Sequence, residues 1–357
     1  MTDLTRRRFL ALTAASTVVA GCTDIAADTS PVVHAPGSSP ATTTPRRTPK
    51  PATSPPPAPP PAKLQANELG QLPVLMHHRL VTSSAGAYDQ TPDFFRQELE
   101  RLYRENYHPV RAIDLARRDL TAVPAGKTPV VLTFDDSTPS QVAFDSAGRV
   151  ESDCALGILR GFHARHPDFP AVATFYVNRN PFGLSGAAVP QALVRLTALG
   201  CEIGNHTWSH PNLHTLSRAE AEAEIGKLAA MVRGATPASP CGTLALPLGV
   251  HPRDSSVLAR GGRGSTAYRN LAVLLVGANP SLSPYHRDFD PMAIPRIRCS
   301  SHRNGRGPLE FNYWLDQLAT RPGLKYIAAG NPAHVTAPSS LRQSLAPGLA
   351  DRAIWWN

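Results

Sequence analysis

Short apolar runs alternate along this chain with longer segments in which apolar residues recur every three or four positions. The runs at residues 130–134, 171–177, 243–246 and 271–276 are almost entirely apolar, which predicts strands buried on both faces. The longer segments predict amphipathic helices. Because strands and helices that alternate in this way are typical of a parallel sheet or barrel, we expect an α/β domain.

Two of the expected helices are marked by their first residues. Ser217 with Glu220 has the pattern of a capping box, and the helix that follows is expected to end at Gly234. Thr91 and Pro92 open another helix, whose apolar residues share one face.

Polar residues that suit metal chemistry follow two of the short apolar segments. Asp135 and Asp136 come directly after the run at 130–134, and His206 and His210 follow a later one. An Asp pair alone is more typical of a solvated loop, but neighbouring side chains diverge at a strand end, so one carboxylate can bind a cation while the other transfers a proton. Two histidines and one carboxylate, with positions left open for water, are typical of a catalytic zinc-like site. The joint placement predicts metal-assisted hydrolysis.

These motifs resemble those of the polysaccharide deacetylase family, carbohydrate esterase family 4. Thr-Phe-Asp-Asp at 133–136 and His-Thr-Trp-Ser-His at 206–210 match its first two motifs. Leu-Ala-Leu-Pro-Leu-Gly at 244–249 stands where the family has an Arg-Pro-Pro-Tyr-Gly-like segment, and residues 72–78 are similar to its opening strand. The resemblance covers roughly residues 70–335, and it implies a distorted (β/α) barrel of the polysaccharide deacetylase type.

The resemblance also implies a role for each matching residue. Asp135 would be the general base, and Asp136, His206 and His210 would hold a divalent metal ion, expected to be zinc, with cobalt or another transition metal as alternatives. The ion would polarise a water molecule and the acetyl carbonyl of an acetylated polysaccharide substrate. The backbone N–H of Leu248 would help to hold the oxyanion.

Three positions depart from the family pattern. Ser137 stands where a glycine is usual, which is acceptable if the backbone there does not need a positive φ. Ala245 stands where the family has the arginine that orients the base, so Asp135 is expected to lack that partner. The expected terminal strand at 325–330 contains no histidine in the place of the family's general acid, so the proton donor is unassigned.

Residues 1–22 have the pattern of a twin-arginine lipoprotein signal. Thr-Arg-Arg-Arg-Phe-Leu at 5–10 precedes an apolar run that is too short to span a bilayer, and Ala-Gly-Cys follows it at 20–22. We expect lipidation of Cys22, which would anchor an exported protein at the outer face of the cell membrane, facing the cell wall. The alternative is a soluble product without the lipid.

Composition divides the remainder of the chain. Residues 23–67, rich in Pro, Ala, Thr and Ser, predict an extended linker, which leaves 68–357 as one catalytic domain. The net charge of +9 falls to about +5 once the signal and linker are set aside, a moderate excess that favours loose association with anionic polymers or lipid head groups. Because basic residues are not interleaved with aromatic ones, nucleic acid is not an expected partner. Four cysteines follow the lipidation site, so one or two disulfides are plausible, with Cys201 and Cys241 as one possible pair.

The leading hypothesis is a metal-dependent hydrolase that removes acetyl groups from N- or O-acetylated cell-envelope polysaccharide. The absent arginine and histidine favour an alternative, a wall-polysaccharide-binding protein that keeps the metal site but has impaired catalysis. Retention of Asp135 argues for the enzyme, because a binding protein has no evident need of the base. A related amide hydrolase with a non-carbohydrate substrate is a third possibility, since specificity resides in loops.

Overall fold

The computed structural model describes residues 59–357, except 84, 85, 240, 278 and 309. The predicted signal with Cys22, and the predicted linker as far as residue 58, lie outside the described residues. Among the helices that the structure describes, none combines the length and apolar character needed to cross a membrane.

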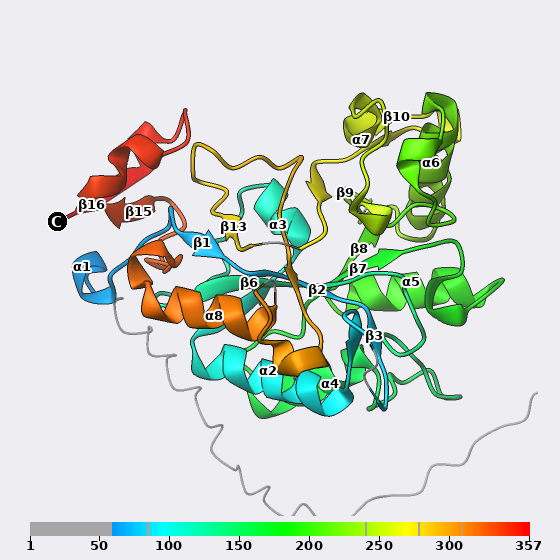
Figure 1. The fold of residues 1–357 in the computed structure, drawn as a ribbon, viewed down its shortest axis with the longest axis horizontal. Helices are drawn as coiled ribbons and strands as arrows, with labels where there is room; N and C mark the ends of the chain where they lie inside the picture. Colours follow the sequence, from blue (N-terminus) through cyan, green and yellow to red (C-terminus); the bar gives the residue numbers. More distant parts are fainter. Residues whose placement is uncertain (1–58, 84–85, 240, 278, 309) are drawn as a thin grey trace, which may run out of the picture. The chain divides into compact units, whose positions relative to one another are not determined.

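A parallel sheet of eight strands forms the centre of the domain (Figure 1). Its order is β12-β9-β8-β7-β6-β2-β14, and β5 also pairs with β6. The strands are β2 (Val74–His77), β5 (Tyr107–Val110), β6 (Thr128–Phe134), β7 (Thr174–Val177), β8 (Glu202–Asn205), β9 (Thr243–Ala245), β12 (Ala272–Leu274) and β14 (Ile297–Arg298). Seven of the eight are buried along their whole length, among them the four strands that the apolar runs predicted, and β14 is half-buried at Arg298.

The sheet curls until its two edges meet. Ile294, just before β14, forms a parallel bridge with Leu274 at the end of β12. Its N–H donates to the carbonyl of Val273, and its carbonyl accepts from the N–H of Leu275. This contact closes the curled sheet across its two outer strands, and the expected distorted (β/α) barrel is confirmed.

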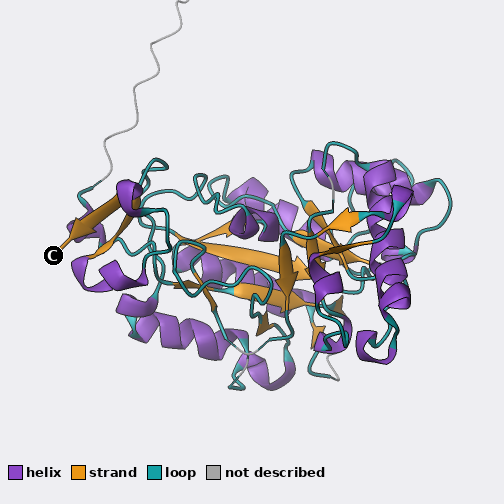
Figure 2. Ribbon diagram, turned by 90° about the horizontal axis from the view of Figure 1, so that it is seen from above, coloured by secondary structure: helices purple, strands orange, loops and turns teal. Residues whose placement is uncertain are grey.

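Most of the helices cover the outside of the sheet, whereas residues 112–116 pack with the side chains inside its curl. In Figure 2 the central strands run through the middle of the described domain. The helices are α1 (Pro61–Leu64), α2 (Pro92–Arg104), α3 (Ala112–Ala116), α4 (Ala155–Arg165), α5 (Ala188–Ala198), α6 (Arg218–Ala235), α7 (Ser256–Ala259) and α8 (Phe311–Thr320). Both predicted caps are confirmed: Thr91 accepts from the N–H of Phe94, and Ser217 forms a capping box with Glu220. The helix α6 ends at Ala235, one residue beyond the predicted end.

Short strand pairs surround the barrel. They are β1 (Gln71–Leu72) with β13 (Ser281–Leu282), β3 (Arg79–Leu80) with β4 (Asp89–Gln90), β10 (Arg260–Gly261) with β11 (Tyr268–Arg269), and β15 (Val335–Pro338) with β16 (Ala353–Trp356). The strand predicted at 325–330 is wrong, because only Lys325 and Ile327 form isolated bridges there.

The cysteines that the structure describes correct another expectation. Cys154, Cys201, Cys241 and Cys299 are all free and buried, so the considered pair of Cys201 with Cys241 does not form. Burial raises the pKa of the Cys201 thiol to about 11, which favours an unreactive thiol packed as a small apolar side chain.

Candidate active site

Alternation along the strands sends one set of side chains into the barrel. On β6, Leu132 and Phe134 pack outward in the core that includes α2 and α4, so Thr133 and Asp135 face the interior. The same alternation turns His206 inward, because Ile203 of β8 packs in the outer core. The predicted base and the first predicted metal-binding histidine therefore lie at the same end of the barrel.

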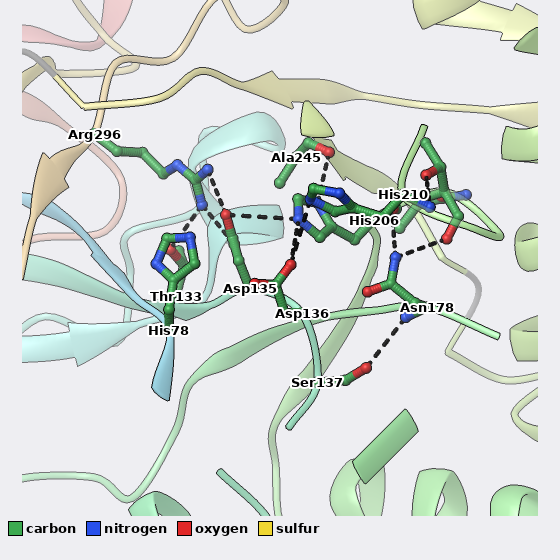
Figure 3. Close-up of polar contacts among 12 residues, drawn as sticks. His78, Thr133, Asp135, Asp136, Ser137, Asn178, His206, His210, Ala245 and Arg296 are labelled. Carbon is green, nitrogen blue, oxygen red and sulfur yellow. Dashed lines mark hydrogen bonds and ion pairs between the residues drawn. The ribbon is translucent and has the colours of Figure 1, made fainter. Parts of the chain in front are cut away.

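The three predicted metal-binding side chains converge at that end (Figure 3). Oδ1 of Asp136 lies 3.3 Å from Nε2 of His206 and 3.4 Å from Nε2 of His210. Two ligand atoms at about 2.0–2.1 Å from a tetrahedral zinc ion are separated by about 3.3 Å, whereas a direct N–H···O hydrogen bond is usually shorter. The spacing therefore fits a metal ion held among the three side chains.

Hydrogen bonds fix the orientation of this loop. Nδ1 of His206 donates to the carbonyl of Ala245 at 2.9 Å, which leaves Nε2 free to bind a metal. Nδ2 of Asn178 donates to the carbonyls of His206 and Thr207 at 2.7 and 3.0 Å. The N–H of His210 donates to Oγ1 of Thr207 at 3.2 Å. Hydrogen bonds of this kind orient the side chains that ligate a metal ion.

Ser137 departs from expectation, because its φ is 45° and thus lies in the left-handed region that favours glycine. Asp136 has a φ of 71°, so two consecutive non-glycine residues carry strain beside the site. Two hydrogen bonds compensate at Ser137: its hydroxyl accepts from the N–H of Asn178 at 3.3 Å, and its carbonyl accepts from the N–H of Phe182 at 2.6 Å.

Arg296 corrects the prediction that Asp135 would lack an arginine partner. Its guanidinium donates to both carboxylate oxygens of Asp135, with Nη1–Oδ1 at 2.7 Å and Nη2–Oδ2 at 2.8 Å. It also donates from Nε to the carbonyl of Leu275 at 2.6 Å and from Nη1 to Oγ1 of Thr133 at 3.2 Å. Burial opposes ionisation of Asp135, but the charges of Arg296 and His206 outweigh it and hold the pKa of Asp135 well below its usual range.

His78 is a second residue that the sequence reasoning missed. It follows β2, on which Leu75 packs in the outer core, so alternation again turns Val74, Met76 and His78 inward. Figure 3 shows its ring beside Asp135, on the side of Arg296. Its Nδ1 is buried and has no hydrogen-bond partner among the described residues, and burial lowers its pKa to about 4.

A cleft of about 450 Å³ joins these side chains. It is lined by His78, Arg79, Tyr88, Asp135, Asp136, His206, His210, Leu246, Leu248 and Val276. Leu248 lies in a 3-10 turn, Pro247–Gly249, with a φ of 57°. In this turn the N–H groups of Gly249 and Val250 donate to the carbonyls of Leu246 and Pro247. The N–H of Leu248 is not the donor of either hydrogen bond. Its role at the oxyanion stays a prediction.

A second group of side chains that could ligate a metal, His77, Glu98 and Cys299, is buried and is not part of the cleft lining. Here Nε2 of His77 lies 2.6 Å from Oε1 of Glu98, which is the distance of a direct hydrogen bond. Nδ1 of His77 contacts the carbonyl of Thr133 at 3.0 Å. This group links β2, α2 and β6 as a hydrogen-bonded network, and its short contact distinguishes it from the more widely spaced side chains predicted to bind metal in the cleft.

An α/β barrel with a paired carboxylate and a three-ligand cluster at one end of its strands has the arrangement of a hydrolase. A family model described as polysaccharide deacetylase matches residues 122–261. The matched residues include both the Asp-Asp and the His-Thr-Trp-Ser-His motifs. The predicted resemblance to the polysaccharide deacetylase family is therefore confirmed.

Individual proteins are similar over parts of the chain. A chitooligosaccharide deacetylase of Sinorhizobium fredii (strain NBRC 101917 / NGR234) is 28% identical over 119 residues, which are 33% of this chain and 45% of that protein. The chain thus spans less than half the length of this relative. The Streptococcus pyogenes deacetylase PplD, solved with acetate, has 19% identity and a TM-score of 0.49, over 64% of this chain and 92% of that one. IcaB from Ammonifex degensii has 19% identity and a TM-score of 0.42, over 65% and 93%.

Proposed function

We propose that this protein is a metal-dependent hydrolase that removes acetyl groups from N- or O-acetylated polysaccharide of the cell envelope. The observation that carries the proposal is the Asp135 carboxylate, held by both guanidinium N–H groups of Arg296 beside the cluster of Asp136, His206 and His210. A base locked next to a metal-binding cluster suits hydrolysis better than binding alone. The match of the polysaccharide deacetylase model to both motifs supports the choice of substrate.

Asp136, His206 and His210 would hold the divalent ion, for which zinc is the expected identity because two imidazoles and one carboxylate are a usual zinc donor set. When bound, the ion would supply Lewis-acid polarisation of water and of the acetyl carbonyl. Asp135 accepts the proton of the attacking water, and Arg296 keeps its two oxygens fixed while it does so. The N–H of Leu248 would stabilise the charge that develops on the carbonyl oxygen.

We assign proton donation to His78, which is neutral near pH 7 because its pKa is about 4, and which therefore first takes up the proton that Asp135 removes from the water. When the bond between the acetyl carbon and the sugar nitrogen or oxygen breaks, the leaving atom needs a proton. In Figure 3 the ring of His78 lies on the Arg296 side of Asp135, while His206 and His210 lie on the other side. When the carbonyl oxygen of the acetyl group points toward the metal ligands, the sugar nitrogen or oxygen that leaves is on the side of His78. His78→Gln should retain bound metal and lower acetate release about 100-fold or more.

The binding-protein alternative drew its support from the absence of the family's arginine and histidine. That support weakens, because Arg296 pairs with the base and His78 stands beside it. We retain the proposal that the protein is exported and held at the outer face of the membrane through Cys22, which rests on residues 1–22.

The test is acetate release by the purified protein from acetylated chitooligosaccharide, acetylated xylan and peptidoglycan fragments, with added zinc or cobalt. Release should need both the metal and Asp135, so the Asp135→Asn variant is the control. Metal binding without acetate release from any of the three polymers would favour the alternative, a wall-polysaccharide-binding protein with impaired catalysis.

A further inference from the structure

Tyr88 is an exposed aromatic side chain at the edge of the cleft. Five large apolar side chains of the described residues are strongly exposed, namely Tyr88, Val194, Leu248, Leu324 and Ile354. Two of these five, Tyr88 and Leu248, line the cleft that contains Asp135 and Asp136. Exposed apolar side chains that gather at a cleft indicate contact with a ligand more than scattered ones do.

The ring of Tyr88 is held by its neighbours although 43% of the residue is exposed. The guanidinium of Arg298 lies 5.7 Å from the ring centroid, and the ring of His78 lies 4.7 Å from it at an interplanar angle of 57°. Arg298 is fixed in turn by Glu310, with Nη2–Oε1 at 2.7 Å. A ring held in this way loses little conformational freedom when a ligand covers it.

The backbone on both sides of the cleft edge is also fixed. Tyr88 directly precedes β4, which pairs with β3 so that Asp89 stands opposite Arg79. Nε and Nη2 of Arg79 donate to Oδ1 of Asp89 at 2.9 and 2.6 Å. The ring of Tyr88 is therefore attached to a hydrogen-bonded pair of strands beside the cleft.

Resting on the proposed function, we propose that Tyr88 is a stacking platform for a sugar ring next to the one that is deacetylated. Tyr88, His78 and Asp135 line the same cleft, and the rings of His78 and Tyr88 are in contact, so a substrate of linked sugars that runs along the cleft would place one unit at Asp135 and the next over Tyr88. The apolar C–H face of a pyranose suits a flat ring whose polar hydroxyl stays in water. The enzyme accordingly prefers a chain of at least two linked sugars to a single acetylated sugar.

Affinity measurements on the full chain, with the metal removed by a chelator, test the platform without turnover. The probes are the tetramer and the monomer of N-acetylglucosamine, titrated calorimetrically. Tyr88→Ala and Tyr88→Leu should reduce the advantage of the tetramer over the monomer about tenfold, which corresponds to about 1.4 kcal/mol. Tyr88→Phe keeps the flat face and should stay within about twofold of the original protein.

Leu324→Ala is the matched control, because Leu324 is 44% exposed and does not line the cleft. An unchanged tetramer advantage in Tyr88→Ala would overturn the platform, and so would an equal loss in Tyr88→Phe, which would assign the contact to the hydroxyl. A protein that binds neither probe also overturns it. If Tyr88→Ala releases acetate like the original protein and binds the tetramer equally well, the platform is rejected but the proposed function stands. If binding depends on Tyr88 but no acetate is released, the platform stands and the proposed function is rejected.

Discussion

Replacement of Arg296 by methionine should destabilise the protein and remove most of its activity. Arg296 is 0% exposed and is among the largest fully buried side chains of the described residues. Methionine fills comparable space but carries no charge, so the variant leaves the Asp135 carboxylate, 2% exposed, without its guanidinium. A buried carboxylate that loses its cation either stays charged at a high desolvation cost or takes up a proton and ceases to be a base.

The magnitude follows from the four hydrogen bonds of the guanidinium. Two of them join Asp135, and removal of one partner of a buried ion pair costs about 3–5 kcal/mol. The carbonyl of Leu275 and the hydroxyl of Thr133 lose a donor as well. Since domains are stable by about 5–15 kcal/mol, the variant should fold but with a much smaller margin. Turnover should fall about 10²–10⁴-fold, the usual contribution of a positioned base.

Urea unfolding of Arg296→Met, Asp135→Asn and the double variant measures the pair directly. The double variant has neither charge. Its loss of unfolding free energy should therefore be about 2–3 kcal/mol smaller than the sum of the losses in the two single variants. Arg218→Met, which removes an exposed guanidinium bonded to Glu222, is the control and should change stability far less. Additivity of the two single losses, or turnover of Arg296→Met equal to that of the original protein, would refute the reasoning.

Two further predictions concern the metal and pH. His206→Ala and His210→Ala should each greatly reduce the zinc that remains after dialysis, measured by mass spectrometry, and full metal content in both would reject the site. Burial raises the pKa of Glu68 from 4.5 to about 7, so the folded state keeps a proton that the unfolded state releases. Glu68 therefore contributes stability that is complete below pH 4.5 and is lost as pH rises through 7, by up to about 3 kcal/mol. Glu68→Gln should flatten the difference in unfolding free energy between pH 5 and pH 8, and an unchanged difference would contradict this assignment.

The sequence predicted the central strands because burial on both faces leaves a continuous apolar signal. The run at 130–134 lies within β6, and the runs at 243–246 and 271–276 extend only one or two residues beyond the ends of β9 and β12. The run at 171–177 begins three residues before β7. The expected terminal strand at 325–330 failed, because an apolar run shows burial but does not show a partner strand. Here the partners are single residues, Gln71 and Asn67, outside the eight-stranded sheet.

The three residues proposed to bind the metal could be found from the sequence because they lie in two short segments that each follow a strand, and the structure brings them together. His78, the proposed proton donor, was harder to find, although a signal existed. In the segment at 72–78, Leu75 faces the helices, so alternation places His77 outward and His78 inward. A histidine was sought only at the position of the family's last motif. His78 was therefore overlooked, although the alternation along the strand turns it toward the barrel interior.

Arg296, which pairs with Asp135, was missed for a geometric reason. Ile297 of β14 pairs with Leu75 of β2, and Val74 of β2 pairs with Val131 of β6, so Arg296 begins four residues below Asp135 along the barrel. Functional side chains are usually sought at the carboxyl ends of strands, whereas Arg296 precedes its strand. Its long side chain passes Thr133 and Leu275, donates to both, and reaches the carboxylate with two parallel N–H groups. Lysine lacks this fork, so Arg296→Lys should not restore the activity lost in Arg296→Met.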